Sequence, residues 1–214
     1  MNPVLSLYED ILSNGAMLAL SAHPRMIFVV HGAVTIAGKT LSDGETWHGE
    51  GAVTITAGVA GACCWRYELT DGDASGVVPG PGADTRKKIS ATLATLPAGE
   101  LLIRGDSVAF PPGGCAYLHS HQGPGIRCLI EGGIRIDTHG RSTSYGPGGA
   151  WYESGPDAVF AQAAADKPTR FIRVMILPRV LIGKSSIQYV NDDDKAKPKS
   201  QQYKVFTDVA IARP

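Results

Sequence analysis

The sequence is poor in charge and has no excess of either sign. Charged residues make up 19% of its 214 residues, and 20 lysines and arginines balance 20 aspartates and glutamates. Nucleic-acid-binding domains present a basic patch or stripe, so no nucleic-acid partner is expected. Proteins without net charge tend to associate with themselves, and a homodimer is therefore expected.

Long apolar runs are also missing. No stretch reaches the roughly 20 apolar residues that a membrane-spanning helix needs. The first residues, MNPVLSLYEDILSNGA, have Glu9 and Asp10 where a signal peptide has its apolar core. We therefore expect no membrane partner and a cytoplasmic location.

The cysteines lack the CxxC spacing that metal sites favour. Cys63 and Cys64 are adjacent, and Cys115 and Cys128 lie in apolar surroundings. Adjacent cysteines rarely bridge each other, so free thiols are expected at these positions.

The chain is rich in hydrophobic residues (43%), glycine (26) and proline (14), which is the composition of a turn-rich β protein. Short apolar segments follow one another between turn residues, at 26–30, 33–37, 52–57, 63–69, 100–105, 125–136, 158–164, 170–177 and 203–212. Such a series predicts an all-β sandwich or barrel.

One short helix is expected at the N-terminus, over residues 2–13. Asn2 would be its N-cap and Pro3 would lie in its first turn. Leu5, Tyr8, Ile11 and Leu12 recur at helical spacing and would form its apolar face.

The two halves of the chain resemble each other. PRMIFVVHGAVTI (24–36) aligns with PGIRCLIEGGIRI (124–136) at a constant offset, with Gly32 on Gly132 and Ile36 on Ile136. The alignment predicts a duplicated β unit.

The segment GCAYLHSHQGPGIRCLIEGG (114–133) carries the most specific motif of the sequence. The spacing of Gly113, His119, His121, Gly125 and Gly132 resembles the first signature of the cupin family, except that Gly125 stands where the family has a glutamate. With the repeat, the resemblance implies an all-β double-stranded β-helix (jelly-roll) bicupin with a short N-terminal helix.

This resemblance also implies a division of the chain. We expect a degenerate N-terminal barrel over 1–75, a linker over 76–98, a C-terminal barrel over 99–182 and a C-terminal extension over 183–214. Ala19 and Ser21 replace the histidine pair in the first barrel, and Arg25 replaces its glutamate. That barrel is expected to be structural and to bind no metal in the family's manner.

His119 and His121 are two residues apart on an expected strand, so both should face the inside of the second barrel. Family members complete a metal site there with a glutamate and a third histidine, whose place is taken here by Val159. Asp157 is the first candidate for a substitute ligand and Glu153 the second. Imidazole and carboxylate ligands suit Fe, Mn, Ni or Zn, and a divalent transition metal is the expected cofactor.

Arg127 follows Gly125 by two residues and, by alternation, would also face the barrel interior. A buried guanidinium needs an anion, which here is either Asp157 or Glu153, or the carboxylate of a bound substrate. A bulge near the Gly-Pro-Gly sequence would instead turn Arg127 outward.

The primary functional hypothesis is a metal-dependent cupin-type enzyme of the dioxygenase, isomerase, decarboxylase or lyase class. His119, His121 and Arg127 would form its catalytic site, and its substrate would be a small polar molecule with a carboxylate. One alternative is a non-catalytic ligand-binding or sensor protein. The other is metal-free acid–base catalysis by His119 and His121.

Overall fold

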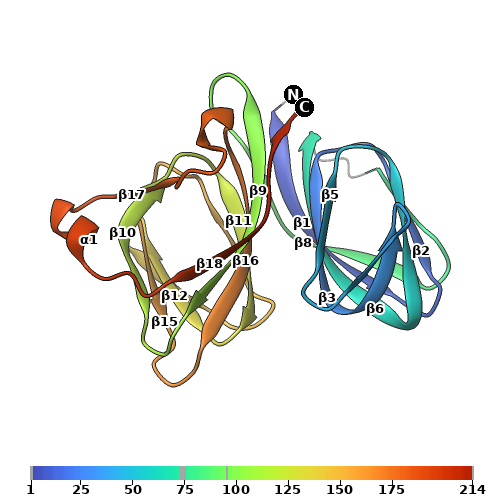
Figure 1. Ribbon diagram of the computed structural model, residues 1–214, viewed down its shortest axis with the longest axis horizontal. Coiled ribbons are helices and arrows are strands. Elements are labelled where there is room, and N and C mark those ends of the chain that lie inside the picture. Colours follow the sequence, from blue (N-terminus) through green and yellow to red (C-terminus); the bar gives the residue numbers. More distant parts are fainter. Residues whose placement is uncertain (1, 73–75, 95, 214) are drawn as a thin grey trace. The chain divides into compact units, whose positions relative to one another are not determined.

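A computed structural model describes residues 2–72, 76–94 and 96–213 (Figure 1). The chain forms two compact units, the first made of residues 1–94 with 211–214 and the second of residues 95–210. Both consist of antiparallel strands, so the all-β prediction is confirmed. Within the described ranges no helix is long and apolar enough to span a membrane. The cysteines are free thiols, as expected.

The first unit is built on one sheet with the strand order β4-β3-β6-β1-β8, and β2, β5 and β7 pair alongside this path. Its strands are β1 (Pro3–Leu12), β2 (Met17–Leu20), β3 (Arg25–Ile36), β4 (Lys39–Ser42), β5 (Thr46–Gly49), β6 (Val53–Asp71), β7 (Val77–Pro79) and β8 (Ala83–Thr92). Register shifts in the β3–β6 pair bend the long β6 strand.

The expected N-terminal helix is wrong, because residues 3–12 form the strand β1 between β6 and β8. β1 is an interior strand buried on both faces, so its apolar residues run almost continuously and also match a helical spacing. Asp10 of this strand is buried and accepts two hydrogen bonds from Arg66.

The segment 76–98, expected to be a linker, contains β7 and β8, which pair with β2 and β1 of the first unit. β8 (ADTRKKISAT) is an edge strand. Lysine and arginine side chains commonly protect such edges from further pairing, which explains its polar sequence.

A chain of buried charges crosses the interior of the first unit. Arg25 pairs with Glu68, Glu68 with Arg66, and Arg66 with Asp10, and all these side chains have zero exposure or close to it. Thr85 donates a further hydrogen bond to Asp10. Arg25, which was aligned with the glutamate of the cupin motif, is thus paired with a carboxylate of its own unit.

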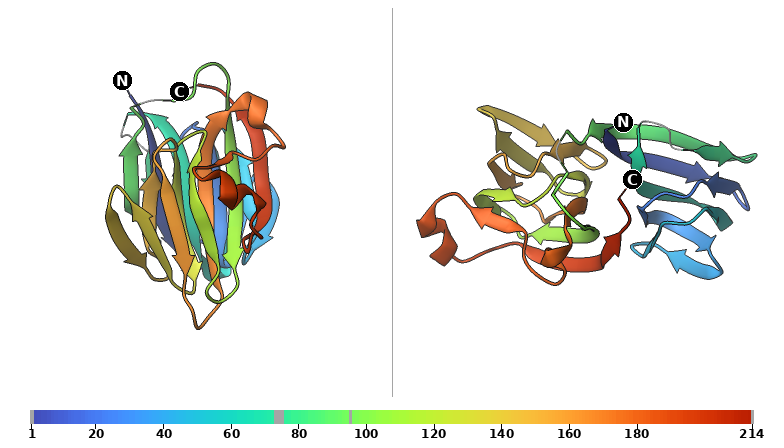
Figure 2. Two further views of the ribbon diagram at one scale, coloured as in Figure 1. Left: turned by 90° about the vertical axis from the view of Figure 1, so that its left-hand side faces the viewer. Right: turned by 90° about the horizontal axis from the view of Figure 1, so that it is seen from above.

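The second unit consists of two five-stranded sheets, β13-β12-β15-β10-β17 and β14-β11-β16-β9-β18 (Figure 2). Its strands are β9 (Leu101–Phe110), β10 (Cys115–His121), β11 (Gly125–Glu131), β12 (Ile134–Thr138), β13 (Arg141–Tyr145), β14 (Ala150–Glu153), β15 (Val159–Ala163), β16 (Thr169–Pro178), β17 (Ile187–Tyr189) and β18 (Gln202–Ile211). An apolar core that includes Phe110, Trp151 and Phe171 fills one part of the space between these sheets.

The expected extension 183–214 adds a strand to each sheet of this unit. β17 pairs with β10, and β18 is the outer neighbour of β9. A 3-10 helix, η1 (Arg179–Leu181), precedes this segment, and a short helix, α1 (Asp192–Ala196), lies on the outside of the unit between β17 and β18 (Figures 1 and 2).

Candidate functional site

His119 and His121 lie on β10 and are both 5% exposed. Their rings meet edge to face, with centroids 4.9 Å apart. β10 is irregular just before the pair, because its register with β15 shifts between Ala116 and His119. The structure thus brings the two histidines together in the interior of the second unit.

The environment keeps both histidines neutral. Burial lowers the pKa of His119, and its Nδ1 donates a hydrogen bond to the carbonyl oxygen of Tyr117, 2.6 Å away. Burial, Arg173 and Arg127 hold the pKa of His121 well below its usual value. Because a carbonyl only accepts, the neutral ring of His119 carries its proton on Nδ1 and leaves Nε2 as an acceptor.

Arg127 points into the same interior and is 1% exposed. Its Nη2 lies 2.7 Å from Oε2 of Glu153, and its Nη1 donates to the carbonyl oxygen of Gly125 over 2.7 Å. Trp151 donates to the other oxygen of Glu153 over 2.9 Å. Burial lowers the pKa of Arg127 to about 10, so the guanidinium is still charged at neutral pH.

Gly125 makes room for this guanidinium. A Cβ at position 125 would lie 2.6 Å from the carbonyl oxygen of Val174 and 2.9 Å from Nη1 of Arg127. These separations are shorter than side-chain contacts allow. Gly125 and the inward position of Arg127 are therefore sterically coupled.

The residues proposed as metal ligands do not fit a metal ion in this arrangement. Glu153 lies 3.8 Å from Nε2 of His121, but the same carboxylate oxygen is paired with Arg127. Asp157 is half exposed and contacts Ser154 and His139 instead of the histidine pair. In residues 2–72, 76–94 and 96–213, no group of three His, Cys, Asp or Glu side chains is placed to hold a metal.

Two further buried arginines, which the sequence reasoning missed, lie beside the site. Arg173 on β16 binds Asp106 on β9 through Nε and Nη2, at 2.9 and 2.6 Å. Arg104 binds Asp208 on β18 and also donates to the carbonyl oxygens of Leu181 and Lys184. Alternation was the available signal, because Arg173 shares its face of β16 with the buried Phe171.

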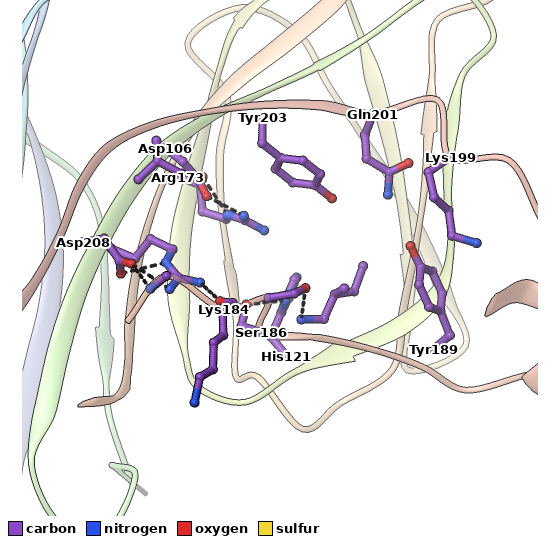
Figure 3. A pocket seen from close by; sticks show the side chains of 15 residues that line it. Asp106, His121, Arg173, Lys184, Ser186, Tyr189, Lys199, Gln201, Tyr203 and Asp208 are labelled. Atoms are coloured by element: carbon purple, nitrogen blue, oxygen red, sulfur yellow. Dashed lines mark hydrogen bonds and ion pairs between the residues drawn. The ribbon is translucent and has the colours of Figure 1, made fainter. Parts of the chain in front are cut away.

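The barrel cavity, which is the space directly around His119, His121, Arg127 and Glu153, has a volume of only about 20 Å³. A much larger C-terminal pocket of about 480 Å³ adjoins it and shares His121, Arg173 and Tyr203 with it. Residues between 183 and 208 line this pocket on several sides, as Figure 3 shows. The expected extension therefore builds a binding space.

The antiparallel β architecture of the chain is consistent with a cupin fold. Its structural neighbours include oxalate decarboxylase of Bacillus subtilis. One structure of that enzyme, from a study of its Mn(II) centres, is 13% identical over 93% of this chain and 81% of the other, with a TM-score of 0.60. A serine-to-alanine variant is 15% identical over 79% and 68% of the two chains, with a TM-score of 0.58.

At this level of identity the likeness concerns the fold alone. No protein-family model matches the sequence, and no curated protein matches it.

Proposed function

We propose that the second unit is a cupin barrel that binds a small carboxylate-bearing molecule without a metal ion. One observation carries the proposal. The Arg127 guanidinium, paired with Glu153, lies next to His121, where the resemblance predicted a metal centre. The Arg127 guanidinium thus lies where a bound metal ion was expected.

The charge of the C-terminal pocket supports an anionic ligand. Arg104, Arg173, Lys184 and Lys199 line it, against the carboxylates Asp106 and Asp208, so four positive groups face two negative ones. His121 adds no charge, since its pKa lies well below neutral pH. Guanidinium groups bind carboxylates through paired, charge-assisted hydrogen bonds.

The state of His121 favours binding over acid–base catalysis. A histidine whose pKa is far below the working pH is a weak base, because it gains little from taking a proton. Catalysis on the same ligand is the second candidate, and the likeness to oxalate decarboxylase, which acts on a carboxylate, favours it. In that case Nε2 of His119, which is an acceptor, would be the proton-accepting atom.

We further propose that the chain is a bicupin whose first unit is structural. In the first unit Ile27 of β3 is opposite Arg66 of β6, and in the second Arg127 of β11 is opposite Arg173 of β16. Ile27 and Arg127, which the sequence repeat aligns, are thus each opposite an arginine of the neighbouring strand, β6 or β16. Both of these arginines, Arg66 and Arg173, are buried.

A homodimer remains part of the proposal. β18 and β14 are the outer strands of their sheet, and unpaired outer strands are the usual places for a second copy to add. Light scattering on the purified chain measures the oligomeric state directly.

The test of the function combines metal analysis with ligand binding. Protein purified without a metal-affinity step is analysed for Fe, Mn, Ni and Zn, beside a His119→Ala/His121→Ala variant. Thermal shift with a panel of carboxylates then reports binding. Substoichiometric metal in both proteins, together with a stabilising carboxylate, supports the proposal. Stoichiometric metal that disappears in the variant would overturn the metal-free site, and the absence of any stabilising carboxylate would overturn the function.

A further inference from the structure

The C-terminal pocket has features that specify its ligand more closely than charge alone. Its volume of about 480 Å³ lies in the range of roughly 300–1,000 Å³ typical of sites for drug-sized molecules. A molecule as small as oxalate would leave most of this space to water. The pocket therefore suits a ligand with a sizeable body attached to its charged group.

Arg173 is the cation that is both buried and directed into the pocket (Figure 3). Asp106 occupies one edge of its guanidinium, through Nε and Nη2. Nη1 makes no hydrogen bond within the described ranges, so the second edge, between Nη1 and Nη2, is available for a carboxylate. The other buried arginine, Arg104, has its nitrogens committed to Asp208 and two backbone carbonyls.

Part of the pocket wall is aromatic or apolar. The Tyr203 ring lies with its centroid 5.8 Å from the Arg173 guanidinium, and Tyr189 lies across the pocket from it (Figure 3). Val205, which also lines the pocket, is 56% exposed. A flat ring between these side chains would cover apolar surface that otherwise faces water.

Gln201 indicates that the ligand carries a hydrogen-bond donor. It is 7% exposed, and its Oε1 is buried without a hydrogen-bond partner in the part of the chain that the structure describes. An unpaired buried acceptor is costly, and a ligand hydroxyl or N–H group would satisfy it.

We propose that the C-terminal pocket binds an aromatic hydroxycarboxylate, with its carboxylate on the free edge of Arg173, its ring against Tyr203 and its hydroxyl donating to Gln201. This inference rests on the proposed function and narrows its ligand class. It places the ligand body beside the barrel cavity, which is too small for it, and brings the carboxylate close to His121.

The experiment is isothermal titration of the full chain with the 4-hydroxy derivatives of benzoate, phenylacetate and phenylpropionate. Matched probes are the unsubstituted acids, the 4-hydroxyphenyl amides that lack charge, and the aliphatic acids acetate, oxalate and succinate. The expected result is that a hydroxylated aromatic acid binds at least about tenfold more tightly than its amide and than each aliphatic acid.

Variants locate the site. Tyr203→Ala and Gln201→Leu leave the buried ion pairs intact and are expected to weaken binding of the hydroxylated acid about tenfold or more. Gln201→Leu should do so without weakening binding of the unsubstituted acid. Val180→Ala, at an exposed residue that does not line the pocket, is the matched control and should bind like the wild type.

The outcomes separate the two proposals. Aliphatic acids that bind as tightly as aromatic ones, with no effect of Tyr203→Ala, would overturn the aromatic hydroxycarboxylate and leave the proposed function standing. Amides that bind as tightly as the acids would overturn the role of Arg173. A chain that binds none of the acids would overturn the proposed function together with this inference.

Discussion

Nη2 of Arg127 lies 2.7 Å from Oε2 of Glu153 in the second unit, where Arg127 is buried and the Glu153 side chain is 12% exposed. A buried ion pair contributes modestly against an apolar replacement of both partners, but removing one partner leaves the other as an uncompensated charge. The pair therefore matters more for the position of the two charges in the site than for the net stability of the fold.

Arg127→Met is expected to lower the free energy of unfolding by about 3–5 kcal/mol, because the buried Oε2 of Glu153 would then have no cation beside it. The double variant Arg127→Met/Glu153→Gln should recover part of this loss. Arg170→Met, which breaks the half-exposed pair with Glu131, is the control and should cost less than about 1 kcal/mol. Urea unfolding measures all of these variants, and equal losses in the two single variants would contradict the assignment.

Gly125→Ala is expected to destabilise the second unit by about 1–3 kcal/mol, because the new methyl group would overlap the Val174 carbonyl and the Arg127 guanidinium. Gly146→Ala is the matched control, since a Cβ there meets nothing within 4 Å. Thermal unfolding of the two variants should separate them clearly. A Gly125→Ala protein as stable as the control would show that Arg127 does not need this space.

Stability should fall on acidification because of His121. Its pKa in the folded chain lies well below the value of about 6.5 expected in the unfolded chain. Below pH 6.5, His121 is protonated in the unfolded chain but stays neutral in the folded chain. Its contribution to the free energy of unfolding is therefore complete above about pH 6.5 and is lost as the pH falls toward the folded pKa. The slope reaches at most about 1.4 kcal/mol per pH unit for one histidine.

Urea midpoints at pH 7.5, 6.5 and 5.5 measure this effect of His121. The His121→Gln variant should show a shallower decline than the wild type, whereas His139→Gln, at an exposed position, should decline in parallel with it. Parallel declines for all three proteins would show that His121 is not the source.

Removing the guanidinium should create metal affinity. In Arg127→Ala, the Glu153 carboxylate is released from its cation and lies near two neutral imidazoles, a ligand set that suits Zn(II). We expect this variant to bind Zn(II) at least about tenfold more tightly than the wild type, measured by competition with a chelating dye. An exposed-site control, Arg135→Ala, should match the wild type, and a wild type that binds as well as Arg127→Ala would contradict the displacement of the metal by Arg127.

Strand periodicity predicted the all-β class and the meeting of the two histidines, because a residue pair with one intervening position shares a face of its strand. It left the direction of Arg127 open. β11 pairs without a shift from Gly125 to Cys128, and the irregularity comes only after Leu129, so alternation holds at Arg127. Periodicity failed at β1, where burial on both faces removed the alternation that separates a strand from a helix.

The C-terminal pocket was beyond such reasoning, because its walls join residues that are distant in sequence. Arg104 is hydrogen-bonded to Asp208, more than one hundred residues further along the sequence, and Arg173 is hydrogen-bonded to Asp106, 67 residues earlier. The segment between residues 183 and 202 is charged and irregular, which suggested an extension rather than part of a site. Only the pairing of β17 and β18 with the two sheets brings it there.

β18 is at once an outer strand of its sheet and a wall of the C-terminal pocket. Local opening of this strand and occupation of the pocket are therefore linked equilibria. Above the dissociation constant, each tenfold rise in ligand concentration makes opening about tenfold rarer, which corresponds to about 1.4 kcal/mol. Once the ligand exceeds its dissociation constant, slowed hydrogen exchange at the amides of β18 would thus report occupancy, including that of a ligand whose identity is unknown.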